Sequence, residues 1–487
     1  MTIPKIDSSL VLDTGLDGHS PVGNNDADVV KAKRSLTPLL LLGFFLTIAV
    51  GCAQVYFLVS AITVLSVSSD LSYLQTVVIA FFFFFFSIFF IGRYLMTMLF
   101  AFLEGSKKVT DWTLPETEAP LVTIIIPAYN EVENIESTIT SALHINYPAL
   151  QVIVVDDGST DATFQSAQDF VTRHTDSHVT SSIQVVTQKN TGKAAALNHG
   201  YSLATGDYIL SMDADSELDP NSVRRLVART LASGAEVVAG QVLIKNTRNM
   251  LSYLQHLEYI MMNGTSRMFQ SFFSAVLVAP GPITLFSRVG LEKSIKFRKE
   301  SNTPETDIVS GPWETSTFAE DAKLSMTILA AGGKSVFEPT AVCLTQAPLS
   351  LKALLNQRYR WIRGNLQAIK SSWNLWTRVP SNKPGLGLWL TWFIIESIIW
   401  PLVDVFGALI IVLILVNSSA FDQGFMWYIA LMSADVAAAL FAASVCNARL
   451  NLALLVPFYR MGYGFLLQGI ALIAFIDESR RTKMTWS

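Results

Sequence analysis

Two long blocks of apolar sequence, one toward each end of the chain, constrain its fold more than any other feature. The first runs from Leu39 to about Phe100, and the second from Leu386 to Ile476. Hydrophobic residues make up 51% of the 487 residues and charged residues only 15%, which is too apolar for a soluble protein of this size. Helices of this length cross the hydrocarbon core of a bilayer, which is about 30 Å thick. We therefore expect an integral membrane protein.

The first block predicts two transmembrane helices within residues 37–104, preceded by a disordered cytoplasmic tail over residues 1–36. Basic residues flank this pair on both sides, which places both flanks in the cytoplasm. The second block predicts transmembrane and interfacial helices over residues 386–476, followed by a short tail over residues 477–487. We expect a multi-pass protein of the plasma (inner) membrane with a cytoplasmic central domain. The number of C-terminal passes stays open.

Between the blocks, residues 118–348 alternate short β-branched runs with amphipathic helical stretches. This alternation is typical of βαβ units around a mainly parallel sheet. The predicted strands are Leu121–Ile126, Gln151–Val155, Ile183–Thr187, Tyr208–Met212 and Val237–Ile244. We expect an α/β domain inserted between the helical membrane segments.

Charge and cysteine content exclude several classes of function. The formal net charge is only −4, and no basic stripe alternates with aromatic residues, so nucleic acid is not an expected partner. The cysteines Cys52, Cys343 and Cys446 lack the spacing of a metal site. The six histidines form no cluster in the sequence.

Carboxylates follow two predicted strands, at the edge where open α/β sheets bind ligands. Asp156 and Asp157 follow one strand, and Asp213 and Asp215 follow another. Residues two apart on an extended segment share a side, so Asp213 and Asp215 can converge on a Mg²⁺ or Mn²⁺ ion that holds a diphosphate. Asx-turns or helix caps are the alternative for both pairs. Lys193 stands where a loop enters a helix, a position that favours phosphate, with a surface lysine as the alternative.

A third acidic pair, Glu320 and Asp321, precedes a helical run. Acidic residues in a first helical turn are also favoured by the helix dipole alone, so a purely structural role for this pair stays open. A transferase that displaces a nucleoside diphosphate needs a base for the acceptor hydroxyl, and no histidine cluster offers one. Asp321 is the candidate catalytic base, with Glu320 beside it.

A basic and aromatic cluster lies in residues 349–380, an amphipathic stretch that can rest on the bilayer surface. Arg358 and Arg360 could neutralise a departing phosphate, and the Trp361 ring could support a sugar. A basic interfacial helix with an anchoring tryptophan is the alternative. The same helix can both anchor at the membrane surface and bind phosphate and sugar.

Taken in order, these elements resemble the membrane-embedded glycosyltransferases of family 2, which include cellulose, chitin, hyaluronan and poly-N-acetylglucosamine synthases. The resemblance covers about residues 118–365. It rests on five elements: Pro127-Ala128-Tyr129-Asn130-Glu131, Asp156-Asp157-Gly158, Asp213-Ala214-Asp215, Glu320-Asp321, and a Gln-x-x-Arg-Trp signature formed by Gln357, Arg360 and Trp361. Five elements in this order make the resemblance specific.

The resemblance implies a Rossmann-like GT-A fold, a uridine-diphosphate (UDP) sugar donor and inversion at the anomeric carbon. It implies the following roles: Tyr129, Glu131 and Asp157 bind uracil and ribose; Asp213 and Asp215 bind nucleotide and divalent metal; Asp321 is the base; Arg360 contacts the diphosphate; Trp361 and Gln357 line the acceptor site. The Gly-Pro of the loop Val278–Ile283 resembles the hyaluronan and chitin type, whereas Glu320-Asp321-Ala322 followed by Leu324 resembles the cellulose and poly-N-acetylglucosamine type. The donor sugar therefore stays open, with glucose or N-acetylglucosamine favoured.

These implications favour a processive synthase that extends a β-linked polysaccharide and extrudes it through its own membrane helices. Its expected partners are the UDP-sugar, the growing polysaccharide, the lipid bilayer and accessory export subunits. One alternative is a non-processive membrane glycosyltransferase that makes a glycolipid. Another is a transporter or scaffold whose central domain only binds nucleotide.

Overall fold

The computed structural model describes residues 92–107, 115–173, 183–300, 311–376, 385–399, 401–402, 405 and 421–482. The predicted N-terminal tail and most of the predicted first pair of transmembrane helices lie outside these residues. Residues 92–105, at the end of that pair, are helical. Much of the segment between residues 400 and 420 also lies outside the described part.

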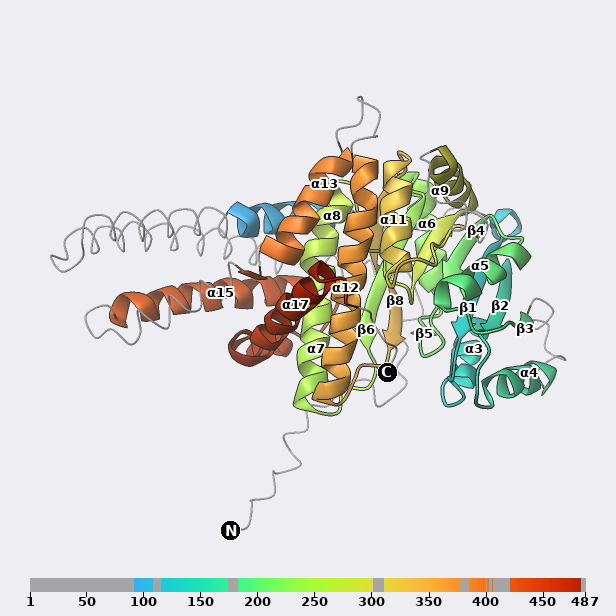
Figure 1. The fold of residues 1–487 in the computed structure, drawn as a ribbon, viewed down its shortest axis with the longest axis horizontal. Coiled ribbons are helices and arrows are strands. Elements are labelled where there is room, and N and C mark those ends of the chain that lie inside the picture. The colour runs from blue at the N-terminus through green and yellow to red at the C-terminus, as the bar shows by residue number, and fades with distance from the viewer. Residues whose placement is uncertain are drawn as a thin grey trace, which may run out of the picture.

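The central domain is built on one eight-stranded sheet in the order β3-β2-β1-β4-β7-β6-β8-β5 (Figure 1). Its parallel half consists of β1 (Val122–Ala128), β2 (Leu150–Asp156), β3 (Ile183–Thr187) and β4 (Tyr208–Ser211). In the other half, β7 (Thr284–Ser287) runs antiparallel to both β4 and β6 (Val237–Ile244), β8 (Ser335–Thr345) runs parallel to β6, and β5 (Glu217–Leu218) pairs antiparallel with β8. The five predicted strands are present, whereas β5, β7 and β8 were not predicted.

Strand β1 shows why the chain forms a three-layer domain. All seven of its residues are buried, as expected for a parallel strand covered on both faces. Ile124 packs in one hydrophobic cluster and its neighbour Ile125 in another. The first cluster includes residues of α3 (Ile135–Leu143), α4 (Thr163–Arg173) and α6 (Ser222–Ser233), and the second includes residues of α5 (Lys193–Leu203) and α11 (Glu320–Ala330). Helices therefore cover both faces of the sheet.

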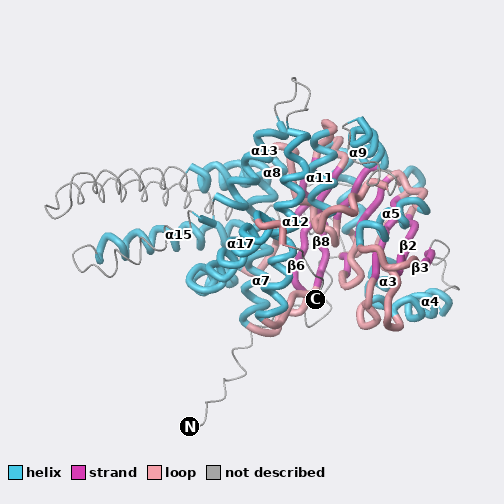
Figure 2. The backbone as a smooth tube through the Cα atoms, in the orientation of Figure 1, coloured by secondary structure: helices cyan, strands magenta, loops and turns pink. Residues whose placement is uncertain are grey.

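A second group of helices lies beside the β6–β8 half of the sheet, and α15 projects away from it (Figures 1 and 2). These elements are α7 (Met250–Met261), the π-helix η4 (Met262–Arg267), α8 (Met268–Phe272), α12 (Leu351–Trp376), α13 (Gly385–Ile394), the π-helix η5 (Ile395–Ile399) and α15 (Phe421–Val445). The C-terminal elements are η6 (Leu450–Leu455), α16 (Val456–Phe458), the π-helix η7 (Tyr459–Tyr463) and α17 (Gly464–Ser479). The short η2 (Glu116–Glu118) precedes β1, and α9 (Arg288–Glu300) follows β7.

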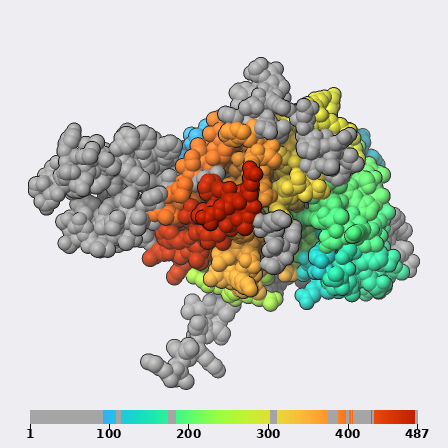
Figure 3. Space-filling model, in the orientation of Figure 1, coloured from blue at the N-terminus to red at the C-terminus, as the bar shows by residue number. Residues whose placement is uncertain are grey.

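Among the described residues, one helical run, Leu450–Ser479, is long and apolar enough to cross a membrane. Only 11% of its apolar 18-residue stretch is buried inside the protein. A shorter apolar helix covers Met432–Val445. The C-terminal run lies across α12 on the surface shown in Figure 3, where it is coloured red over orange. Apolar side chains including Phe465, Leu466 and Ile473 are exposed along α17. Of the other residues predicted to cross the membrane, 385–399 and 421–445 are helical, whereas most of the N-terminal pair and most of residues 400–420 lie outside the described residues.

Candidate active site

The loops after β1 and β2 are joined at the carboxyl edge of the sheet. Asn130 adopts a left-handed backbone conformation with φ 57°, in which its N–H donates to Ser159 Oγ at 3.0 Å. Its side-chain oxygen accepts from Thr160 N at 2.8 Å. The predicted nucleotide residues Tyr129 and Glu131 flank this turn, and Tyr129 is 45% exposed. The side chain of Tyr129 is therefore accessible at the edge where a nucleotide is expected.

Asp157, predicted to bind the nucleoside, contacts a loop of the protein itself. The residue is buried, and its carboxylate accepts from Gln188 Nε2 at 2.7 Å, Thr191 N at 3.0 Å and Gly192 N at 2.8 Å. These bonds fix the loop that leads into α5. The next residue must be glycine, because Gly158 has φ +67° and a Cβ there would lie 2.7 Å from the backbone N of Asn190. The Asp-Asp-Gly motif thus positions Lys193, the first residue of α5.

Lys193 brings the second and third acidic clusters together. Its Nζ lies 2.6 Å from Asp213 Oδ1 and 3.5 Å from Glu320 Oε1. Asp321 stands beside them, with Oδ2 accepting from Gly281 N at 3.1 Å and Oδ1 from Ala322 N at 2.7 Å. These contacts gather residues that lie more than a hundred positions apart in the sequence.

Gly281 lies at the centre of this group, where a larger residue would displace the Lys193 ammonium. A Cβ at this position would be 2.8 Å from Lys193 Nζ and 3.6 Å from carboxylate oxygens of both Asp213 and Asp321. Ser211, the last residue of β4, donates to the Gly281 carbonyl at 2.8 Å and so holds the loop in place. The loop Val278–Ile283, noted in the sequence, therefore forms one wall of the acidic cluster.

Burial dominates the electrostatics of the cluster. Burial raises the pKa of Glu320 to about 7 and also raises that of Asp321, while the Lys193 ammonium opposes both shifts. Burial alone would lower the pKa of Lys193, but the charges of Asp213, Glu320 and Asp321 outweigh it and raise this pKa. One ammonium thus faces three carboxyl groups. The cluster has the composition expected where a cation or a transferred proton is accommodated.

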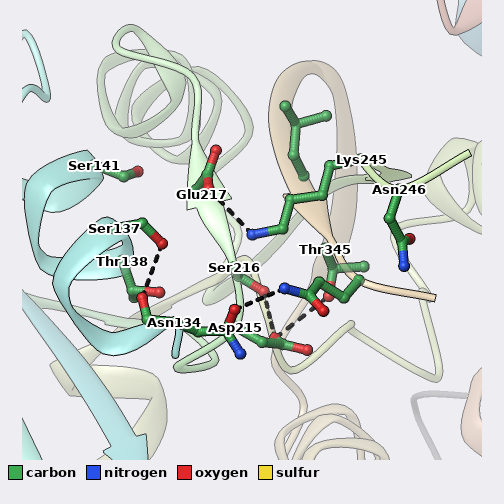
Figure 4. A network of polar contacts seen from close by, with 12 residues as sticks. Asn134, Ser137, Thr138, Ser141, Asp215, Ser216, Glu217, Lys245, Asn246 and Thr345 are labelled. Atoms are coloured by element: carbon green, nitrogen blue, oxygen red, sulfur yellow. Dashed lines mark hydrogen bonds and ion pairs between the residues drawn. The ribbon is translucent and has the colours of Figure 1, made fainter. Parts of the chain in front are cut away.

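Asp215 lies in the turn after β4, in the polar network of Figure 4. Its Oδ1 accepts from Ser216 Oγ at 3.1 Å and Thr345 Oγ1 at 3.4 Å. Burial, followed by the charge of Asp213, raises the pKa of Asp215. Burial also raises the pKa of Glu131, which the Asn134 hydrogen bond lowers and the charges of Asp215 and Asp213 raise further. Glu131 and the two aspartates therefore share one negatively charged region.

The end of β8 completes this region and was missed by the sequence analysis. Gln346 donates to Asn134 Oδ1 at 2.6 Å, and Asn134 donates to Glu131 Oε2 at 2.8 Å. Residue Thr345, the last of β8, contacts Asp215. The rule that polar residues at strand ends form sites could have identified these residues, had β8 been recognised as a strand.

Two aspartates alone do not enclose a metal ion. Within the described ranges, no three or more His, Cys, Asp or Glu side chains form a group that could hold one. Mg²⁺ in nucleotide sites is commonly bound by one or two carboxylates, with phosphate and water oxygens as its remaining ligands. The all-oxygen pair Asp213 and Asp215 fits this kind of site. It does not fit a site built from protein ligands alone.

The aromatic and basic cluster lies on α12, and its two arginines differ. Arg358 is buried, binds both carboxylate oxygens of Glu258 at 3.2 and 2.8 Å, and donates to Gln357 Oε1 at 2.6 Å. The predicted phosphate role of Arg358 therefore does not match its contacts, because its guanidinium is occupied by a carboxylate. Arg360 is exposed, and Trp361 is 41% exposed. Glu258 was not predicted, since it lies in an ordinary amphipathic helix without a motif.

Comparisons with known proteins show which fold this domain has and which family it resembles. A mannosyltransferase from Pyrobaculum calidifontis, solved in complex with GDP-Man and Mn²⁺, shares the fold with a TM-score of 0.51 and 20% identity, covering 80% of this chain and 96% of that one. The domain is a GT-A-like glycosyltransferase domain. Residues 123–295 match the family described as Glycosyl transferase family 2.

Two curated relatives indicate which glycosyltransferases this domain resembles. A poly-β-1,6-N-acetyl-D-glucosamine synthase from Staphylococcus epidermidis is 28% identical over 283 residues, covering 57% of this chain and 62% of the relative. The corresponding synthase from Staphylococcus aureus is 29% identical over 272 residues, covering 54% and 58% of the two chains. The chain therefore spans about three fifths of these relatives. Both relatives are named as synthases of the same polysaccharide.

Proposed function

We propose that this protein is an inverting, metal-dependent hexosyltransferase that polymerises a sugar from a UDP-sugar donor into a β-linked polysaccharide. The observation that carries the proposal is the meeting of Lys193, Asp213, Glu320 and Asp321 at the carboxyl edge of the sheet. The names of the curated relatives favour N-acetylglucosamine, with glucose as the second candidate.

Asp321 is the proposed base. The acceptor hydroxyl oxygen attacks the anomeric carbon, the bond from that carbon to the UDP oxygen breaks, and the hydroxyl proton passes to the Asp321 carboxylate. Burial raises the pKa of Asp321, which makes its carboxylate a stronger proton acceptor. The hydrogen bonds from Gly281 N and Ala322 N orient the carboxylate. Protonated Asp321 then returns its proton to solvent.

Asp213 and Asp215 are the proposed ligands of a divalent cation, which when bound would neutralise the diphosphate as negative charge develops on it. Mn²⁺ in the Pyrobaculum structure supports this choice of ion. We expect EDTA to abolish transfer and added Mg²⁺ or Mn²⁺ to restore it, measured by incorporation of labelled sugar. Full activity in EDTA would contradict the assignment of a metal site.

Lys193 and Arg360 are proposed to counter the charge of the diphosphate, and Tyr129, Glu131 and Asp157 to lie on its nucleoside side. The Asp157 contacts assign it a further part, because it orders the loop that presents Lys193. Trp361, with Gln357 beside it, is the proposed platform for the acceptor sugar, since aromatic rings stack on sugar faces.

We also propose that the protein works in the plasma (inner) membrane, with the catalytic domain on the cytoplasmic side, and passes its product through its own helices. The apolar run Leu450–Ser479 supports membrane attachment. It lies against α12, which carries the proposed acceptor platform. Acceptor and bilayer would then be neighbours, as processive export requires.

The test is a donor panel. Membranes containing the full chain are incubated with labelled UDP-N-acetylglucosamine, UDP-glucose and other nucleotide sugars, and products are separated by size. We expect long polymer from UDP-N-acetylglucosamine or UDP-glucose. A single organic-soluble glycolipid would instead support the non-processive alternative. Nucleotide binding without any transfer would support the transporter or scaffold alternative.

A further inference from the structure

We infer that Glu258 is a positioning residue for sugar transfer: by holding the Arg358 guanidinium against the Trp361 ring, it sets the orientation of the acceptor platform. This inference rests on the proposed function, in which Trp361 is the platform for the acceptor sugar. It assigns a role to Glu258, which lies in α7 and belongs to no motif.

The Glu258–Arg358 pair has a defined geometry. The two carboxylate oxygens of Glu258 accept from Nε and Nη2 of Arg358 at 3.2 and 2.8 Å. Such a two-point contact fixes the plane of the guanidinium as well as its position. The Arg358 side chain is only 4% exposed, so bulk water competes little for these bonds.

The fixed guanidinium lies over the indole of Trp361, 4.3 Å from the ring centroid. A cation at this distance from the face of a tryptophan is attracted to the ring. The Tyr259 ring, also on α7, lies 6.3 Å from the Trp361 ring centroid. Trp361 is 41% exposed, so this support acts on a ring that can still be reached by a ligand.

A third group ties the pair to the C-terminal apolar run. The Tyr463 hydroxyl, in η7, donates to Glu258 Oε2, and the Tyr463 side chain is buried. Glu258 therefore joins α7 of the catalytic domain, α12 with the platform, and the C-terminal run. Any change in how that run packs would reach Trp361 through this carboxylate.

Helix α12 carries a second ion pair. Comparing the two pairs distinguishes an effect on the position of the Trp361 ring from an effect on stability. Arg363 binds Glu478 Oε2 through Nη2 at 3.0 Å, with side-chain exposures of 3% and 17%, nearly those of Arg358 and Glu258 at 4% and 19%. Breaking either pair leaves a buried arginine without its carboxylate. The two arginines differ in the ring that they contact: Arg358 lies over the Trp361 ring, whereas Arg363 lies over the Tyr359 ring, 5.6 Å from its centroid.

The experiment compares Glu258→Gln with the matched control Glu478→Gln in the full-length protein in membranes. Initial rates are measured with UDP-N-acetylglucosamine and a short β-linked N-acetylglucosamine oligosaccharide, or with their glucose counterparts if the donor panel selects UDP-glucose. We expect Glu258→Gln to raise the acceptor KM on the order of 10-fold and to shorten the polymer, while the donor KM stays within about twofold. Arg358→Lys should act in the same way, since lysine lacks the planar fork.

Thermal unfolding of both glutamine variants in detergent supplies the second readout. We expect similar destabilisation by both, with the change in acceptor KM confined to Glu258→Gln. Equal acceptor KM values in the two variants, or an unchanged KM and polymer length in Glu258→Gln, would overturn the inference. Absence of polymer from the wild-type protein would instead count against the proposed function.

Discussion

At the scale of single residues, Lys193 shows how one side chain can join motifs that the chain separates. It follows a loop fixed by Asp157, and its ammonium contacts carboxylates from the second and third acidic clusters. Its side chain is 36% exposed, so Lys193 lies at the edge of the cluster with its ammonium turned toward the carboxylates. The contrast with Arg358 is instructive, because there a residue within the signature is occupied by a carboxylate from another helix.

The proposed base gives the first prediction at this scale. Asp321→Asn keeps the shape of the side chain but removes the proton acceptor, so we expect transfer to fall on the order of 10²- to 10⁴-fold. Nucleotide affinity should change little, as measured by equilibrium binding of labelled UDP. Asp169→Asn, on the exposed face of α4, is the control. Normal turnover by Asp321→Asn would exclude it as the base.

Glu320 gives a prediction about pH. Burial raises its pKa from 4.5 to about 7, so between these values the folded protein binds more protons than the unfolded chain. The stability that this difference supplies is present in full below about pH 4.5 and is lost as the pH rises through about 7. In the nucleotide-free protein we expect Glu320→Gln to lessen this loss. Thermal unfolding across the window, compared with wild type, measures it; identical pH profiles would contradict the assignment.

At the scale of elements, π-helical segments shape the contact between the catalytic domain and the C-terminal helices. Segment η4 packs on α15, and Gly264 permits the approach, since a Cβ there would lie 2.5 Å from Ala442 Cα. The π-helix η7 carries Tyr463 to Glu258. π-Helical turns are often found at functional sites. Here they are the elements that bring residues of the C-terminal helices to the catalytic domain.

Gly264→Ala tests this packing. The added methyl group meets backbone atoms of α15, which cannot move as a side-chain tip can, so we expect destabilisation of about 1–3 kcal/mol. Gly462→Ala in η7 is the matched control, because nothing lies within 4 Å of its added Cβ and alanine favours helices by up to about 1 kcal/mol. Thermal unfolding in detergent compares the two. Equal stability of both variants would show that η4 and α15 are not tightly packed.

In the molecule as a whole, the proposed catalytic site lies beside the helical run proposed to cross the membrane. The α/β domain occupies one end, and α12 lies between it and the C-terminal apolar run (Figures 1 and 3). Arg363 on α12 binds Glu478, and Tyr359 donates to Asp477 at 2.7 Å, near the end of that run. Helix α12, which carries the proposed acceptor platform, is thus hydrogen-bonded to the helical run proposed to cross the membrane.

This layout predicts vectorial synthesis. When the full chain is reconstituted in liposomes and the labelled UDP-sugar is supplied outside, outward-facing molecules should deposit polymer in the lumen. The polymer should resist an added glycosidase until detergent opens the vesicles. Polymer that is fully digested in intact vesicles would contradict export through the protein's own helices. Vesicles incubated in EDTA serve as the control without synthesis.

The sequence by itself determined the local elements, because strand and helix patterns depend on neighbouring residues. It predicted β1 and β2 to within a few residues, and β3 and β6 fully. Strands β5, β7 and β8 were not predicted, so the antiparallel pairings of the sheet were not predicted either. Carboxylates at strand ends could be predicted because parallel strands share an edge.

Only the tertiary structure decided which side chains meet. The contact of Lys193 with Glu320, the place of Gly281 among three charged groups, and the pairing of Glu258 with Arg358 all join distant segments. No periodic pattern encodes such contacts, since they depend on how whole helices pack on the sheet. The chemical types of the site residues were therefore apparent in the sequence, and their partners were determined by packing.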